Sequence, residues 1–212
     1  MSKLDQAIRK HLNRFLTSLI DQEKAKVIVP PYHSEPGFWF GGGSLVKDED
    51  GVIWLSGRYR NVGDSRTGLE GGQRGLECTI FRSDDDGKTF HKVRQWNKEE
   101  LSYDHRVVSY EGTALNRQAD GTWELFISSE KDIPYPAPFH PYQKPGTGIW
   151  TIDRMTGPAP DDLDPSTLAP VLSSLDRPEN LHVKDPVVFD APDGRTALVF
   201  CSHPFSWSAG NT

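Results

Sequence analysis

Three segments of the sequence share one pattern, in which a short apolar run, an Asp-Gly pair and a second apolar run follow one another. The glycines of the three pairs, Gly51, Gly121 and Gly194, recur at intervals of about 70 residues. Asp-Gly between two alternating apolar runs is a strong signal for a β-hairpin, because glycine readily adopts the positive φ of a tight turn. From residue 27 onward we therefore expect repeated antiparallel units rather than helices.

Further strand-like sequence follows the first two hairpins. LECTIFRS and TFHKVRQW follow the first, and GIWTIDRM and STLAPVLSS follow the second. Four antiparallel strands per unit is the composition of a β-propeller blade, and the third unit supplies only two strands, so we expect about two and a half to three blades. The predicted fold class is all-β: a partial β-propeller over residues 27–212, incomplete at its C-terminus, preceded by an N-terminal amphipathic helix within residues 1–26.

The N-terminal segment has helical periodicity. Its apolar residues fall on one stripe, formed by Leu4, Ile8, Leu12, Phe15, Leu16, Leu19 and Ile20. We expect this stripe to dock on the main domain; a membrane-surface or partner helix is the alternative. The segment has no continuous apolar stretch of signal-peptide length, so a cytoplasmic location is expected.

Composition narrows the functional classes. The chain has 24 Lys and Arg against 30 Asp and Glu, a formal net charge of −6. This balance argues against nucleic acid as a partner, because a nucleic-acid binder needs a basic surface. No apolar run is long enough for a membrane span, and no histidine spacing indicates a metal site, so neither a membrane nor a metal or cofactor is expected. Cys78 and Cys201 fall in different units, and we expect both to be reduced and far apart.

Residues 83–90, SDDDGKTF, carry a more specific motif. They resemble the Asp-box, a recurrent turn of sialidases and other propeller proteins, at the positions Ser83, Asp85, Gly87, Thr89 and Phe90. The physical logic is a turn in which Asp and Ser side chains bond backbone N–H groups and glycine allows positive φ. In propellers this turn joins the third and fourth strands of a blade, which is where the strand assignment places it. A calcium site is the alternative, although the spacing of an EF-hand is absent.

Two further segments resemble five-bladed propeller glycoside hydrolases, families 43 and 32 and their relatives. YEGT at 110–113 is similar to the segment around their general-acid glutamate, and KDPV at 184–187 is similar to their Lys-Asp-Pro or Arg-Asp-Pro segment. The resemblance covers roughly residues 40–205 and implies cleavage of a glycoside or oligosaccharide by paired carboxylates. The family usually has an acidic residue where this chain has glycines 41–43. It also usually has its Asp-Pro segment before the glutamate.

Topology predicts which side chains meet. In an antiparallel blade the start of the first strand and the end of the second lie at the same end. Glu111 and Asp185 start first strands, whereas Arg58, Glu130 and His203 follow second strands. The resemblance implies that Glu111 is the general acid, with Asp185 as its partner carboxylate, acting as base, nucleophile or pKa modulator.

The remaining candidates are expected to bind substrate. An axial Arg58 favours a substrate with an acidic group, and an internal salt bridge to Glu111 is its alternative. Trp39 is either a core residue or a platform on which a sugar stacks. Glu130 and His203 complete the expected substrate-binding set, and Gly112 is expected to leave room for the sugar.

Two functional classes remain open from the sequence. A glycoside hydrolase would show two or three converging carboxylates. A non-catalytic propeller that binds glycans or proteins would show acids held by Arg and Lys, without an open pocket. A sialidase-like exo-glycosidase is a weaker third alternative, because it needs an arginine cluster and a tyrosine nucleophile.

Overall fold

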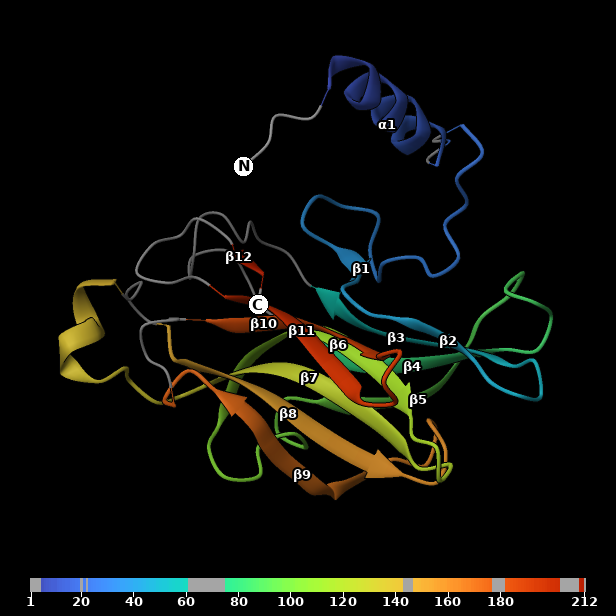
Figure 1. Ribbon diagram of the computed structural model, residues 1–212. Coiled ribbons are helices and arrows are strands. Elements are labelled where there is room, and N and C mark those ends of the chain that lie inside the picture. Colours follow the sequence, from blue (N-terminus) through green and yellow to red (C-terminus); the bar gives the residue numbers. More distant parts are fainter. Residues whose placement is uncertain are drawn as a thin grey trace.

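The computed structural model describes residues 5–19, 21, 23–60, 75–142, 147–176, 182–202 and 210–211. In these ranges the chain forms one α-helix, a short 3₁₀ helix (Ala137–Tyr142) and three antiparallel β-sheets (Figure 1). No helix in the described part of the chain is long and apolar enough to cross a membrane. The structure is thus mostly β, as the hairpin repeats predict.

The first sheet has the order β1-β3-β4-β5, and β2 also pairs with β3. Its strands are β1 (Trp39–Gly41), β2 (Leu45–Lys47), β3 (Ile53–Arg60), β4 (Glu77–Ser83) and β5 (His91–Asn97). Both β1 and β2 run antiparallel to β3. The edge of the sheet that was predicted as one strand therefore consists of two short strands. The interruption falls on residues 42–44, which include two glycines.

The second sheet has four strands in chain order, as predicted. They are β6 (Val107–Arg117), β7 (Trp123–Lys131), β8 (Ile149–Gly157) and β9 (Asp164–Ser173).

The third sheet contains β10 (Val183–Asp190), β11 (Thr196–Ser202) and β12 (Gly210–Asn211). The prediction of only two strands in this unit is wrong, because the two-residue β12 pairs with β11. The two residues of β12, Gly210 and Asn211, are of types depleted in strands, so they gave no strand signal.

The Asp-Gly turns are confirmed in all three sheets. They connect β2 to β3, β6 to β7 and β10 to β11. Gly51, Gly121 and Gly194 have φ values of 84°, 91° and 80°. These positive values explain why glycine stands at each turn, since side chains with a Cβ are strained there.

The turn at residues 83–90 joins β4 to β5, the third and fourth strands of the first predicted unit. Asp85 Oδ1 accepts hydrogen bonds from the backbone N–H groups of Lys88 and Thr89, and Asp85 Oδ2 accepts one from the Thr89 hydroxyl. The hydroxyl of Ser83 accepts the N–H of Gly87 at 2.9 Å. The hydrogen bonds from Thr89, followed by those from Ser83 and Lys88, lower the pKa of the Asp85 carboxyl. This side chain therefore holds the turn closed.

Apolar side chains fill the space between neighbouring sheets. The larger cluster joins the first and second sheets and includes Trp54, Ile80, Trp96, Leu125 and Met155. A smaller cluster joins the second and third sheets and includes Phe126, Trp150, Ile152 and Val183. Burying each of these side chains contributes roughly 1.5–3 kcal/mol. The sheets therefore stand face to face, and this packing fixes the relative positions of their first strands.

Neither cysteine forms a disulfide within the described chain, in agreement with the prediction that both are reduced. Cys78 lies on β4 and is completely buried, and Cys201 lies on β11 of another sheet. Burial raises the pKa of the Cys78 thiol to about 12, so this cysteine stays protonated at neutral pH.

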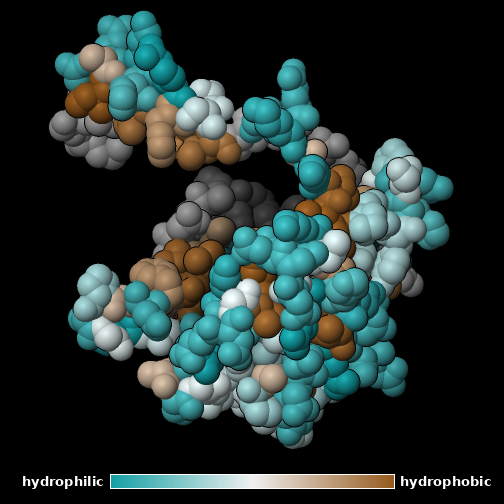
Figure 2. Space-filling model, turned by 90° about the vertical axis from the view of Figure 1, so that its right-hand side faces the viewer, coloured by the Kyte–Doolittle hydropathy of each residue, from teal (hydrophilic) through white to brown (hydrophobic). Residues whose placement is uncertain are grey.

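The helix α1 (Gln6–Ser18) begins after Asp5, whose carboxylate accepts the N–H of Ala7. Its apolar stripe is exposed, with Phe15 at 54% and Leu16 at 56%. The expectation that the helix docks on the main domain is therefore not met in this structure. Figure 2 shows the helix separated from the main body, with apolar side chains on its surface. Amphipathic periodicity identifies an apolar face but does not identify the surface that covers it.

The outer faces of the first and third sheets are covered differently. On the first sheet, Val29 packs with Tyr59 and Phe81, and Tyr32 stacks on Tyr59 with ring centroids 4.0 Å apart. On the third sheet, β10 leaves Val187 and Phe189 exposed at 58% and 47%. The intervening Val188 packs toward the second sheet, so both faces of β10 are apolar.

Candidate active site

The predicted acids lie on matching irregularities of two neighbouring sheets. On β6, Tyr110 pairs with Ser129 and Thr113 with Ile127, so β6 has one residue more than the facing segment of β7. Glu111 is the first residue of this β-bulge. A bulge re-aims a side chain relative to the regular alternation of a strand.

The third sheet repeats this geometry. On β10, Lys184 pairs with Cys201 and Val187 with Val199, which again leaves one extra residue. Asp185 is the first residue of this bulge, at the position that Glu111 occupies on β6. Its φ is +51°, a left-handed conformation that Asp tolerates better than most residues do.

The first sheet has an equivalent extra residue but no acid. Gly41 pairs with Arg58 and Leu45 with Leu55, so the first edge again has one residue more than β3. Gly42 is the first residue after Gly41 and has a φ of +69°. The bulge position that carries a carboxylate on the second and third sheets therefore carries only hydrogen on the first.

Two cations flank the Glu111 carboxylate. Arg58 Nη2 lies 3.6 Å from Oε2, and Lys184 Nζ lies 3.6 Å from Oε1. The side chain of Glu111 is 25% exposed, whereas those of Arg58 and Lys184 are 9% and 16% exposed. The structure thus brings together a partly accessible carboxylate and two largely buried positive charges.

The Asp185 carboxylate has a different environment. Its Oδ1 accepts the N–H of Gly112 at 3.2 Å, and its own N–H donates to the Ser128 hydroxyl at 2.8 Å. The residue as a whole is exposed, yet surrounding atoms remove part of the water from its carboxyl group. This desolvation and the charge of Glu111 raise the pKa of Asp185, and they outweigh the opposing effects of Lys184 and Arg58.

Aromatic rings hold both cations. The guanidinium carbon of Arg58 lies 4.5 Å from the centroid of the Trp39 ring, and Lys184 Nζ lies 3.8 Å from that of Trp150. Trp39 is half-buried and lies on β1 rather than in a loop. It thus packs against the arginine, a role outside the two alternatives considered from the sequence.

The other predicted residues have different outcomes. Glu130 lies on β7 and is completely buried, and its Oε1 accepts the N–H of Gly148. This position favours support of the backbone over contact with substrate. His203 lies outside the described residues. The expectation that Gly112 leaves room for a sugar is wrong, because a Cβ there would lie 2.7 Å from Asp185 Oδ1.

Sequence reasoning missed Lys184 as a site residue. Adjacent residues of a regular strand point to opposite faces, so Lys184 and Asp185 are not expected to share a site. The bulge breaks this alternation, and Lys184 contacts Glu111 while Asp185 contacts Gly112. The signal available in the sequence was the position of Lys184 directly before Asp185 in the KDPV segment.

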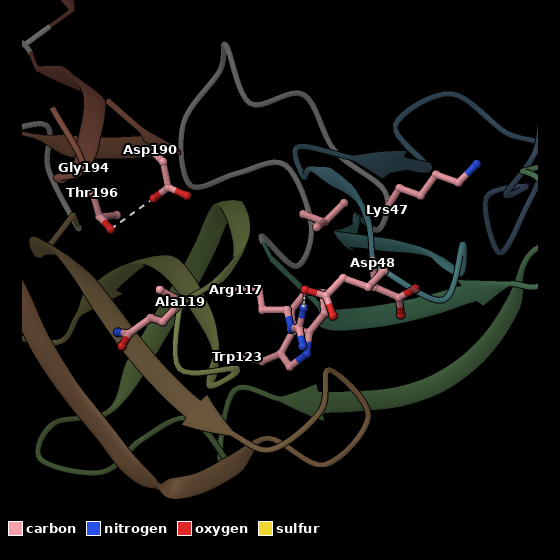
Figure 3. A pocket seen from close by; sticks show the side chains of 11 residues that line it. Lys47, Asp48, Arg117, Ala119, Trp123, Asp190, Gly194 and Thr196 are labelled. Carbon is pink, nitrogen blue, oxygen red and sulfur yellow. Dashed lines mark hydrogen bonds and ion pairs between the residues drawn. The ribbon is translucent and has the colours of Figure 1, made fainter. Parts of the chain in front are cut away.

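A hollow of about 860 Å³ lies at the hairpin end of the sheets. Figure 3 shows the side chains that line it. Residues from all three sheets line it, among them Lys47, Asp48, Arg117, Trp123, Asp190 and Thr196. Neither Glu111 nor Asp185 lines it. The candidate active site is therefore defined by the paired acids and their cations. In the part of the chain that the structure describes, no group of three or more His, Cys, Asp or Glu could hold a metal ion.

Comparisons with known proteins give matches only among solved structures. No protein-family model matches the chain, and no curated protein matches it. A β-xylosidase/α-arabinofuranosidase of glycoside hydrolase family 43 from a compost microbial metagenome, in complex with xylotriose, matches with a TM-score of 0.55 and 10% identity. That match covers 83% of this chain and 46% of the enzyme.

Two bacterial enzymes give similar matches. An endo-arabinase from Bacteroides thetaiotaomicron has a TM-score of 0.52 and 17% identity, over 88% of this chain and 57% of the enzyme. A family 43 enzyme from Xanthomonas citri, in complex with xylotriose, has a TM-score of 0.51 and 14% identity, over 77% and 40%. The chain thus spans about half the length of these proteins. At such low identities the likeness shows the fold, that of part of a β-propeller glycoside hydrolase.

Proposed function

We propose that the chain belongs to a glycoside hydrolase that cleaves a glycosidic bond of an oligosaccharide or glycoside with Glu111 and Asp185. The observation that carries this proposal is the matching bulge geometry, which presents one carboxylate from each of two adjacent sheets. The Gly112 N–H connects them, because it belongs to the Glu111 bulge and donates to Asp185. Glycosidic cleavage by a carboxyl pair requires one protonated and one ionised group.

The environments of the two acids favour a division of roles. Asp185 has a raised pKa and receives a neutral backbone donor, whereas Glu111 faces two cations. We therefore assign Asp185 the role of general acid, which donates a proton to the leaving oxygen. Glu111 acts as the ionised partner that activates water or attacks the anomeric carbon. This reverses the roles that the family resemblance implies.

The three sheets are interpreted as blades of a propeller within residues 27–212, with the helix in residues 1–26 outside it. The exposed Val187 and Phe189 on β10 support a further element beyond the third sheet, since the first two sheets bury such faces against each other. The coverage of about half of each structural neighbour also supports a partial propeller.

Leaving-group dependence tests the assignment in the full-length protein. Asp185→Asn should lower kcat/KM roughly 10²–10⁴-fold on oligosaccharides and much less on dinitrophenyl glycosides, because a good leaving group needs no proton. Glu111→Gln should lower kcat/KM on both kinds of substrate. Glu49→Gln is the matched control, since Glu49 is exposed and pairs with Arg117 at the hairpin end. Loss in Glu111→Gln only on poor leaving groups would show that Glu111 is the acid.

A non-catalytic propeller that binds glycans is the second candidate. The observation that favours it is that both Arg58 and Lys184 lie 3.6 Å from Glu111, so the acid is held by cations. Binding of oligosaccharides by the full-length protein without cleavage of any would establish it.

A further inference from the structure

We propose that the substrate carries an acidic group, the carboxylate of a sugar acid, which binds Arg58 in the space beside Gly42. The proposal rests on the proposed glycoside hydrolase function and names its substrate class. It comes from the bulge at Gly42, which lacks the acid that the second and third sheets carry at the equivalent position.

Gly42 leaves space at this position. A Cβ built on Gly42 would lie 3.5 Å from Arg58 Nε and 3.9 Å from Gly112 Cα, both ordinary contact distances. Its neighbour Gly43 differs, because a Cβ there would lie 1.7 Å from the Ser56 carbonyl oxygen. Crowding therefore does not exclude a side chain at Gly42. The space that the glycine leaves borders the guanidinium of Arg58.

Arg58 provides an unsatisfied donor toward this space. The residue is 8% exposed, and its Nε is buried without a hydrogen-bond partner among the described residues. Its distance of 3.6 Å to Glu111 is an ion pair but too long for a hydrogen bond. A buried Nε–H without an acceptor is costly, so a bound oxyanion would supply the acceptor that the described residues do not provide.

The charges near Arg58 also favour an anion. Arg60 lies two residues further along β3, so it points to the same face, and it too is buried with an Nη2 that lacks a partner within the described chain. Arg58 and Lys184 both lie 3.6 Å from the Glu111 carboxylate, and the charge of Arg60 acts on Arg58 as well. Positive side chains thus gather at this site, although the whole chain has a net charge of −6.

Matched sugar pairs isolate the acidic group. D-glucuronate differs from D-xylose, and D-galacturonate from L-arabinose, by the carboxylate on the pyranose ring alone. Isothermal titration of the full-length protein should show at least tenfold tighter binding of one uronate than of its neutral counterpart. Equal or weaker binding of both uronates would overturn the proposal.

Substitution at Gly42 tests the position. Gly42→Asp places a carboxylate beside Arg58, and should abolish the preference for the uronate. Gly42→Asn is the matched control, because it has nearly the same size and the same positive φ but no charge, and both residues tolerate this conformation. Equal preference in the two variants would overturn the proposal. Arg58→Gln should remove the preference as well.

Inorganic phosphate is the other source of an oxyanion. One outcome would overturn the assignment to a sugar acid. In it, phosphate competes with neutral sugars, its binding is weakened by Gly42→Asp, and the protein shows no preference for a uronate. Aryl uronides and aryl xylosides separate this inference from the proposed function. Binding of uronides without cleavage refutes the hydrolase alone, whereas cleavage of xylosides with no binding of uronides refutes the acidic substrate alone.

Discussion

The bulges of β6 and β10 place a carboxylate at the same position and surround it differently. Glu111 stands between Arg58 and Lys184, whereas Asp185 faces a backbone N–H and has a left-handed backbone. Neighbouring strands, rather than the acids themselves, produce this asymmetry. Two like groups on a repeated scaffold can thereby take unlike protonation states, which is the arrangement that acid–base chemistry uses.

The largest expected effect on stability comes from the contact between the two bulges. Gly112→Ala would place a Cβ 2.6 Å from Asp185 Cα, so one bulge must move. We expect the free energy of unfolding to fall by about 2–3 kcal/mol, the usual cost of overpacking. Chemical denaturation measures it. A change below roughly 0.5 kcal/mol would mean that the two bulges are not in close contact.

A smaller effect should follow from loss of the bond that supports only the Asp185 bulge. Ser128→Ala removes the acceptor of the Asp185 N–H, and we expect a loss of about 1–2 kcal/mol. Ser109→Ala is the matched control on the same sheet, because its buried hydroxyl has no hydrogen-bond partner within the described chain. Equal losses in thermal denaturation would show that the Ser128 bond contributes nothing specific.

The smallest effect concerns pH. The pKa of Asp185 is raised in the folded chain, so the folded chain keeps a proton that the unfolded chain releases near pH 3.9, about the ordinary pKa of Asp. Binding of this proton contributes to the free energy of unfolding. This contribution is present below about pH 3.9 and is lost as the pH rises through the folded pKa. The unfolding free energy of Asp185→Asn should therefore fall less steeply over this range than that of the parent. Identical slopes in denaturant titrations would contradict the raised pKa.

Sequence reasoning succeeds where a feature is local. The Asp-Gly hairpins and the turn closed by Asp85 depend on a few adjacent residues, and the structure has them where they were expected. The presence of Glu111 and Arg58 in one place follows from the strand order, which the hairpins define.

The remaining site features depend on partners distant in sequence. A bulge is defined by the residue count of the facing strand, so the alternation of β10 could not reveal that Lys184 reaches Glu111. The burial of Glu130 and the space taken by Asp185 above Gly112 depend on how the sheets stack. The helical period of the apolar stripe on α1 could be read from the sequence, but the surface that covers the stripe could not.

The hydrogen bond from the Gly112 N–H to Asp185 also offers a spectroscopic handle. An amide proton that points at a carboxylate senses whether that carboxylate is charged, so its chemical shift follows the titration. The ¹⁵N–¹H resonance of Gly112 would thus report the ionisation of Asp185 without any substrate. It would also register the arrival of a bound anion, since a third negative charge changes how readily Asp185 gives up its proton.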